Sequence, residues 1–294
     1  MKKQIRAKKT KSPRRKLEVR KKRTTNPRDS KNKSIKATRG NPTDSLKNRQ
    51  EILVEGRNSI IEMLKSKTWI EKVIIQEDIN IDEKINEILK RASNRGVFIM
   101  RKPKKYLDKI SQTGVHQGCI AKARFQYSNF EELIIENDRH KSTNNYIYIR
   151  ESQYEHNVGA IARSAEAGGF NGILIQPKDR ITPSMFRTSM GSLSNIKVCQ
   201  TSLFSAIKTA KQNNLIVIGI ERGETAVNNF ELDLSGPCLF IIGGEDRSLS
   251  EQITSKCDHI AKIPMVGKIN SLNMSVAAAI VIFEKLRQEM NLGV

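Results

Sequence analysis

Apolar and polar residues alternate along the chain in short blocks that predict strands and helices in turn. In the first folded part, at residues 50–126, strands are expected at 52–56, 72–76, 97–100 and 118–123. Apolar residues recur there at the three- and four-residue spacing of helices that bury one face, near 58–64, 81–92 and 104–110. This part of the chain therefore predicts a small, self-contained α/β domain.

A second series of blocks, at residues 145–294, has more continuously apolar strands. Runs at 173–176 and 215–220 are typical of parallel strands that helices cover on both faces. Further strands are expected at 146–150, 196–200, 238–243 and 259–265. Helices are expected at 157–167, 183–191, 203–212, 250–257 and 271–288. Both parts therefore predict the α/β class, and residues 127–144, with one or two helical turns, are expected to link them.

The segment 263–283 joins the last expected strand to the last expected helix. Pro264 has no amide hydrogen to give to a sheet and should end the strand. Ser271 or Asn273 can cap the helix, because their side chains accept hydrogen bonds from free amides of the first turn. Open α/β folds place ligand sites at such strand ends, although an ordinary connection has the same pattern. The apolar run 276–283 is expected to be buried.

Charge is concentrated at the N-terminus. Residues 1–50 hold 20 lysines and arginines against three acids, a net charge of +17, whereas the other 244 residues carry only +4. Such a block of like charge predicts a disordered arm, here residues 1–49, that binds a polyanion through release of counterions. A merely solubilising tail and an organellar transit peptide are the alternatives.

Several classes of protein are not indicated. No apolar run reaches the roughly 18 residues of a membrane span, and no apolar core follows the N-terminal charges as in a secretory signal. The four cysteines and four histidines are scattered, so we expect no metal site and a reducing compartment, the cytoplasm. The sequence also lacks the glycine-rich fingerprint of dinucleotide-binding folds, the phosphate-binding loop of nucleotide hydrolases and the nucleophile elbow of hydrolases.

Three polar turns remain, each expected at a strand end of the second part. In the first turn, Asn157 can cap a helix that carries Arg163 and many small residues, which should let the helix approach a neighbour closely. In the second, an apolar strand ends in Gly243, Gly244 and Glu245, and glycines allow a ligand to approach the backbone closely. The third is the segment 263–273. An arginine, a glutamate and a Ser/Asn pair at three strand ends together indicate a site.

These turns, read as N-x-G-A-I-x-R, I-I-G-G-E and I-P-M-x-G-x-x-x-S-L-N-x-S-V-A, resemble the SpoU (TrmH-type) family of RNA 2′-O-ribose methyltransferases. The resemblance covers about residues 145–290. The preceding part, with Glu55-Gly56-Arg57 and His116-Gln117-Gly118, is similar to the family's RNA substrate-binding domain. The layout of the two domains is most similar to that of bacterial 23S rRNA guanosine methyltransferases.

The resemblance implies a trefoil-knotted methyltransferase domain, a homodimer, an RNA substrate and S-adenosylmethionine bound in the knot. It implies a cofactor pocket lined by Gly243, Gly244, Ile263, Met265 and Leu272. It also implies a catalytic and substrate-positioning set formed by Asn157, Arg163, Glu245, Ser271 and Asn273.

Arginine is a poor general base because it stays protonated in proteins. We therefore expect Arg163 to hold the RNA phosphate and ribose and to stabilise developing alkoxide charge, with Asn157 and Glu245 orienting it. The sequence departs from the family pattern at Tyr154-Glu155, where Asp-Pro is common, and at 246–248, where Gly-x-Gly is common. These changes leave open a tRNA substrate, or a weakly catalytic paralogue that acts in RNA binding or ribosome assembly.

Overall fold

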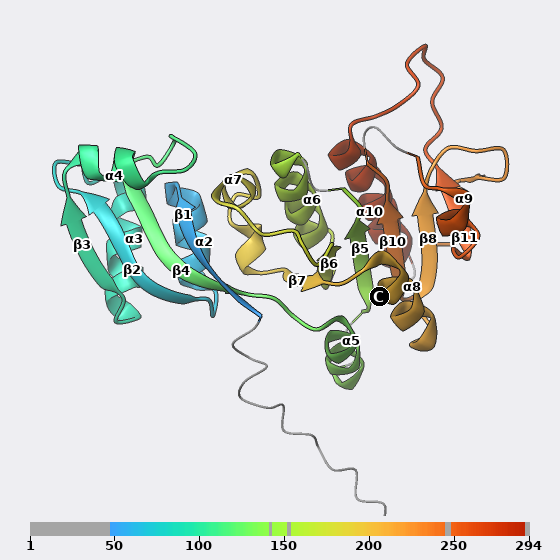
Figure 1. Ribbon diagram of the computed structural model, residues 1–294, viewed down its shortest axis with the longest axis horizontal. Coiled ribbons are helices and arrows are strands. Elements are labelled where there is room, and N and C mark those ends of the chain that lie inside the picture. Colours follow the sequence, from blue (N-terminus) through green and yellow to red (C-terminus); the bar gives the residue numbers. More distant parts are fainter. Residues whose placement is uncertain (1–47, 141–142, 152–153, 245–247, 292–294) are drawn as a thin grey trace, which may run out of the picture. The chain divides into compact units, whose positions relative to one another are not determined.

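The computed structural model describes residues 48–140, 143–151, 154–244 and 248–291. The basic segment 1–49 that the sequence sets apart therefore lies outside the described residues, except for its last two. The described residues form two sheets, each packed against helices (Figure 1).

The first sheet has four strands in the order β1-β4-β2-β3. Strand β4 runs antiparallel to β1 and β2, and β3 runs parallel to β2. The elements are β1 (Arg49–Glu55), α2 (Arg57–Lys65), β2 (Trp69–Gln76), α3 (Glu83–Asn94), β3 (Phe98–Lys102), α4 (Lys104–Ile110) and β4 (Cys119–Gln126). Successive residues of β2 point to opposite faces, so Val73 and Ile75 pack in the cluster that includes α2 and α3, whereas Ile74 packs against Leu107 of α4.

The second sheet has seven strands in the order β7-β6-β5-β10-β8-β11-β9, and every pair in it is parallel. Its strands are β5 (Asn145–Ile149), β6 (Gly172–Ile175), β7 (Lys197–Gln200), β8 (Ile216–Ile220), β9 (Val227–Asn228), β10 (Cys238–Ile242) and β11 (His259–Lys262). Its helices are α5 (Phe130–Arg139), α6 (Glu155–Ala167), α7 (Pro183–Thr188), η1 (Ser192–Ser194), α8 (Leu203–Gln212), α9 (Glu251–Thr254) and α10 (Met274–Asn291).

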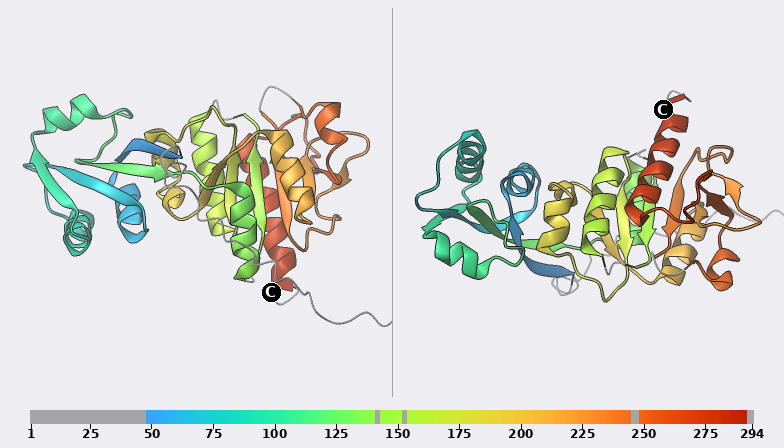
Figure 2. Two further views of the ribbon diagram at one scale, coloured as in Figure 1. Left: turned by 60° about the horizontal axis from the view of Figure 1, so that its bottom comes forward. Right: turned by 90° about the horizontal axis from the view of Figure 1, so that it is seen from above.

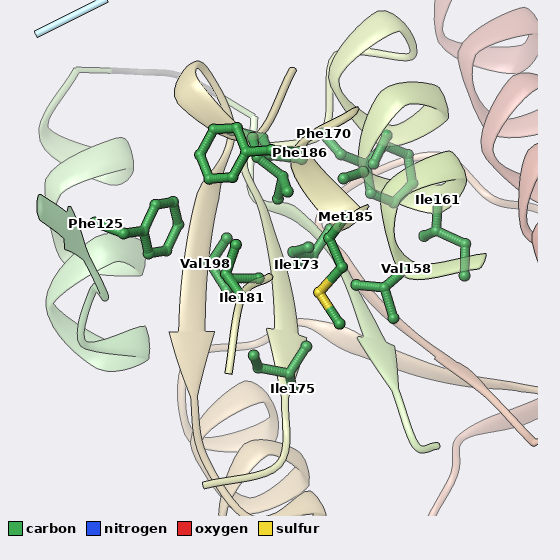
Figure 3. Close-up of a cluster of buried hydrophobic side chains, with 14 of the residues drawn as sticks. Phe125, Val158, Ile161, Phe170, Ile173, Ile175, Ile181, Met185, Phe186 and Val198 are labelled. Carbon is green, nitrogen blue, oxygen red and sulfur yellow. The ribbon is translucent and has the colours of Figure 1, made fainter. Parts of the chain in front are cut away.

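Helices cover both faces of the second sheet, as the apolar strands predict. Every residue of β5, β6 and β10 is buried. Helices α6 and α10 pack on one face, while α5 and α8 pack on the other (Figure 2). On the first face, Val158 and Ile161 of α6 lie beside Met185 and Phe186 of α7 over the strands (Figure 3). The sheet is thus fixed between two apolar layers, and only its strand ends are free to form a site.

Small residues allow α6 to lie close to α7. A Cβ atom added to Gly159 would come within 2.6 Å of the Met185 carbonyl oxygen and 2.8 Å of the Thr188 Cβ atom. Backbone atoms cannot move aside as a flexible side chain can, so only glycine fits at this position. The prediction that small residues bring this helix close to a neighbour is confirmed.

A buried lysine attaches α10 to the sheet. Lys285 is fully buried, and its ammonium group donates hydrogen bonds to the carbonyl oxygens of Leu234 and Gly236, each at 2.7 Å. It also pairs with Glu289 at 3.0 Å, and Glu289 in turn accepts a hydrogen bond from Asn145 at the start of β5. Burying a charge is costly unless it is paired, and these contacts satisfy it. The helix is therefore fixed to the turn before β10.

Some sequence-based expectations were wrong in detail. Asn157 does not cap α6, which begins at Glu155; Asn157 lies inside its first turn. Strand β11 ends at Lys262, so residues 263–265, which were expected to belong to the strand, lie outside the sheet. Helix α5 has ten residues, more than the expected turn or two. The Asn129 side chain caps its first turn, and its buried residues Phe130, Leu133 and Ile134 hold it in place. Strand β9, two residues long, is too short to give a periodic signal. The apolar run 276–283 was expected to be buried, but Val276 and Phe283 are 48% and 45% exposed, because a helix packed on one side presents some of a continuous apolar run outward.

Candidate active site

A cavity of about 750 Å³ opens where β8, β10 and β11 end. These are three neighbouring strands of the parallel sheet, so their carboxyl ends lie at one edge. The residues that line the cavity follow these strands, at 220–224, 242–244, 248, 261–263 and 265, or lie at the start of α10, at 270–272, 274 and 277. Gly243, Gly244, Ile263, Met265 and Leu272, which the family resemblance assigns to the cofactor, all line it, and Ser271 lines it as well.

The loop after β8 joins the other two loops through hydrogen bonds. The Glu221 carboxylate accepts a hydrogen bond from the Leu249 amide at 2.7 Å, in the segment that follows β10. The Arg222 guanidinium donates to the Asn270 carbonyl oxygen, in the segment that precedes α10. Residues 221–224 were not among those that the sequence predicts for the site. In the sequence, these residues are recognisable only as a charged turn directly after the apolar strand 215–220.

Two asparagines that are 116 residues apart meet beside the cavity. The Asn273 side-chain amide donates a hydrogen bond to the Asn157 side-chain oxygen at 3.0 Å. Asn157 is buried on α6, and the Asn273 side-chain oxygen accepts from the Ser275 amide at 2.9 Å. Asn273 therefore caps α10, as one of the two predicted caps, and also connects α10 to α6. Of the predicted catalytic residues, the structure brings this pair into direct contact.

Arg163 and Ser271, two of the other predicted catalytic residues, have exposed side chains. Arg163 is exposed on α6 and does not line the cavity. Six residues along a helix give a rise of about 9 Å and a rotation of about 240° from Asn157, so the two side chains leave α6 in different directions. Ser271 is exposed at the rim, and Glu245 lies outside the described residues. The arrangement offers a polar rim around a partly apolar cavity.

The thiols of the described residues are held away from solvent. Cys119, Cys199 and Cys238 are buried, and burial raises the pKa of each to about 12. The partly exposed Cys257 thiol has its pKa raised to about 11, again chiefly by burial. Because the thiolate is the reactive form, these thiols are poor nucleophiles near neutral pH. Within the described ranges, no three His, Cys, Asp or Glu side chains are placed to hold a metal ion.

Comparison with known proteins agrees with the geometry. Residues 144–283 match the model of the SpoU rRNA methylase family, and residues 53–128 match the model described as RNA 2′-O ribose methyltransferase substrate binding. A TrmH family tRNA/rRNA methyltransferase of Staphylococcus saprophyticus is 33% identical over 249 residues, which cover 83% of this chain and 98% of that protein. The chain belongs to the SpoU (TrmH) family of RNA methyltransferases.

Other members of this family show the same extent of similarity. A TrmH family tRNA/rRNA methyltransferase of Staphylococcus haemolyticus is 31% identical and matches 83% of this chain and 98% of its own length. Among solved structures, the SpoU methyltransferase AviRb of Streptomyces viridochromogenes, in complex with AdoMet, has a TM-score of 0.70 at 21% identity over 86% of this chain and 95% of that chain. At that identity the likeness shows the fold. Over the part of this chain that is described, no helix is long and apolar enough to cross a membrane.

Proposed function

We propose that this protein transfers a methyl group from S-adenosylmethionine to a ribose 2′-hydroxyl of a structured RNA, with a guanosine of 23S rRNA as the first substrate to test. The observation that carries the proposal is the cavity formed by the loops after β8, β10 and β11, which lies beside the Asn157–Asn273 pair. Its volume suits a small cofactor. The AdoMet complex of AviRb, which shares the fold, supports the choice of cofactor.

The residues around the cavity fit such a cofactor chemically. Met265, Leu272 and Ile242 offer apolar contacts, while Glu221 and Glu224 offer carboxylates for hydroxyl and cationic groups. Gly243 and Gly244 bring bare backbone to the wall. When bound, the cofactor supplies an electrophilic sulfonium methyl group. The protein is then required chiefly to hold the ribose hydroxyl in line with that group.

Arg163 is the residue we assign to the RNA. Its guanidinium is an exposed cation on α6, so it can bind a phosphate and stabilise negative charge developing on the ribose oxygen. Asn157 is buried and bonded to Asn273, so its role is to hold α6 and α10 in register at the rim. We assign Ser271, at the same rim, and Glu245 to the positioning of the RNA.

The catalytic unit is proposed to be a homodimer whose cofactor loops form a trefoil knot. The exposed apolar residues Val276, Phe283 and Met290 recur every seventh position along α10, which places them on one side of the helix. A second copy of this chain is the proposed cover for that stripe. Light scattering in solution should give the mass of a dimer, and Phe283→Asp should shift it toward the monomer. A wild-type protein that stays monomeric at high concentration contradicts the proposal.

The deciding experiment is a map of ribose methylation across total RNA. RNA from cells that lack the protein is incubated with labelled S-adenosylmethionine and either wild-type protein or Arg163→Ala. A position methylated by the wild type alone identifies the substrate. If the position lies in rRNA the rRNA proposal holds, and if it lies in tRNA the tRNA alternative holds. A wild type that binds the cofactor but methylates no RNA would instead support an RNA-binding or assembly factor.

The departures at Tyr154-Glu155 and 246–248 concern this choice of substrate. Tyr154 precedes α6, is 38% exposed, and lies with its ring 6.0 Å from that of His156. Ser248 accepts a hydrogen bond through its carbonyl oxygen from Arg150 at 2.9 Å, whereas 246 and 247 lie outside the described residues. An exposed ring directly before α6 supports a nucleotide preference that differs from that of family members with Asp-Pro.

We also propose a place in the cell and domain limits. Four cysteines without a disulfide among the described residues support a reducing compartment, the cytoplasm. The proposed limits are 1–49 for the basic arm, 50–126 for the RNA substrate-binding domain, 127–144 for the linker and 145–294 for the methyltransferase domain.

The basic arm should add a salt-sensitive contribution to RNA binding. Deletion of residues 1–47, which stops short of β1, is expected to weaken binding and to flatten the slope of log affinity against log salt, because fewer counterions are released. Filter binding of structured rRNA over a salt series measures both quantities. A slope that does not change on deletion excludes the arm from RNA binding.

A further inference from the structure

The single tryptophan of the protein lies exposed on the first sheet. Trp69, at the start of β2, is 48% exposed. It is paired in register with Arg124 of β4, and directly paired residues of neighbouring strands project to the same face. The Arg124 guanidinium lies 4.3 Å from the centre of the indole ring. One side of the ring is thus stacked with a cation, and half of its surface still meets solvent.

A hollow of about 440 Å³ surrounds this stacked pair. Four exposed cationic residues line it, Arg49, Lys67, Arg124 and Lys197. Its described lining includes no aspartate or glutamate, and none of the four cations forms an ion pair with a described carboxylate. Glu51 is paired in register with Arg124 across β1 and β4, but its carboxylate forms an ion pair with Lys122 at 3.5 Å and is not part of the lining. The lining itself therefore presents four cations around an aromatic ring.

The hollow is also held in shape, and one hydroxyl of its lining has no hydrogen-bond partner. Arg95 donates hydrogen bonds to the carbonyl oxygens of Met63, Leu64, Ser66 and Thr68, which fixes the turn that leads into Trp69. Ser194 lines the hollow, and its hydroxyl oxygen is buried without a partner in the described structure. Buried hydroxyls are usually paired, so Ser194 can turn its hydroxyl toward a group bound in the hollow without losing a contact to the protein.

We propose that this hollow binds one unpaired nucleotide of the RNA substrate, with its base stacked on Trp69 and its phosphates between Arg49, Lys67 and Lys197. The proposal rests on the proposed function for the identity of the polyanion as RNA. Aromatic rings and arginine guanidinium planes are the surfaces on which unpaired bases stack, and lysines beside them neutralise the backbone. A paired base is already stacked in its helix and cannot lie flat on the indole, so the hollow should select single-stranded regions.

The domain has a second basic surface, and the two can be distinguished. Arg101, Lys104, Lys105 and Lys109 are exposed along β3 and α4, and Tyr106 lies there with its ring 5.7 Å from the Lys102 ammonium group. That surface has no hollow among the cavities described and its aromatic ring projects from a helix. The combination of a cavity, a stacked pair and a buried free hydroxyl favours the surface at Trp69.

Because Trp69 is the only tryptophan, its fluorescence reports on this site alone. The full-length protein is titrated, at raised salt to limit binding by the arm, with a short single-stranded oligoadenylate and with a fully paired RNA duplex. We expect the oligoadenylate to quench the fluorescence and the duplex to leave it nearly unchanged. Loss of one stacked base should lower oligoadenylate affinity about tenfold in Trp69→Ala, measured by anisotropy of a labelled strand.

Matched variants separate stacking from charge and from misfolding. Trp69→Phe keeps a ring and should keep most of the affinity, and Phe98→Ala, which removes another exposed ring of the same domain, should change nothing. Lys67→Ala should flatten the salt slope, whereas Trp69→Ala should leave it unchanged because no charge is lost. Unchanged thermal unfolding and cofactor binding show that a variant is folded.

The proposal is overturned if Trp69→Ala binds oligoadenylate as the wild type does, or if duplex and single strand quench equally. It is also overturned if Lys104→Glu with Lys105→Glu abolishes oligoadenylate binding while Trp69→Ala has no effect, since the second surface would then hold the strand. If the proposed function is wrong, no RNA will be methylated. The fluorescence titration does not depend on methyl transfer, so it still shows whether the hollow binds a single strand.

Discussion

Replacement of Arg163 by alanine should lower the rate of methyl transfer by at least about a hundredfold while leaving the affinity for S-adenosylmethionine unchanged. Loss of one group that stabilises developing negative charge typically costs a factor of 10²–10³ in rate. Arg163 is exposed on α6 and does not line the cavity, so its removal should leave the cofactor contacts intact. Single-turnover transfer of a labelled methyl group and calorimetric titration of the cofactor measure the two effects separately.

Two further variants show whether the loss comes from the guanidinium itself. Arg163→Lys keeps the charge but loses the planar fork that matches a phosphate, and should recover only part of the rate. Glu166→Ala changes another exposed side chain of α6, three residues along, and should be nearly silent. If Arg163→Ala lost cofactor affinity in proportion to rate, Arg163 would be structural, and its assignment to the RNA would be wrong.

Replacement of Gly244 by alanine should raise the dissociation constant for S-adenosylmethionine by about threefold. A Cβ atom at Gly244 would overlap the carboxylate of Glu151, which follows β5, and would lie 3.1 Å from the Cβ atom of Glu151. The carboxylate can turn away because it ends a flexible side chain, but it must then take a new place beside the cavity that Gly244 lines. Overpacking costs about 1–3 kcal/mol where neighbours are rigid, so we expect a smaller cost of about 0.7 kcal/mol here, or roughly threefold in affinity. Calorimetric titration of the cofactor measures the change.

The cause of that loss can be tested within the same loop system. Gly267→Ala is the matched control, because a Cβ atom at Gly267 meets no atom within 4 Å. Glu151→Ala in combination with Gly244→Ala removes the overlapping carboxylate and should restore most of the affinity. If the double variant binds as weakly as Gly244→Ala alone, the overlap with Glu151 is not the cause.

The strands and helices were largely predictable because their patterns are local. Runs such as 215–220 and 238–243 mark buried parallel strands, and α4 and α8 were predicted with their observed bounds. The errors fall where tertiary contacts override local preference. Asn157 has the residue type of a helix cap but is buried beside Asn273, a contact that lies 116 residues away in the sequence. The order of strands, with β10 between β5 and β8, is not encoded in any local pattern either.

The candidate site was predictable to a different degree for each wall. The glycines after β10 and the segments 263–265 and 270–272 are recognisable by residue type and by family resemblance, and the structure gathers them around one cavity. Glu221 and Arg222 carry no such signal, because a charged turn after a strand is common on any protein surface. Their part in the site depends on hydrogen bonds to Leu249 and Asn270, which only the folded arrangement reveals.

The residues that form the cavity are synthesised later than the whole of the first sheet. Every wall of the cavity comes from residues 220–277, and α10, which closes it, is attached to the sheet through Lys285. The strands of the first sheet end at Gln126, so that domain is complete in the growing chain long before the cavity is. Domains generally fold in order of synthesis. A nascent chain should therefore present its RNA-binding surface well before it can take up the methyl donor.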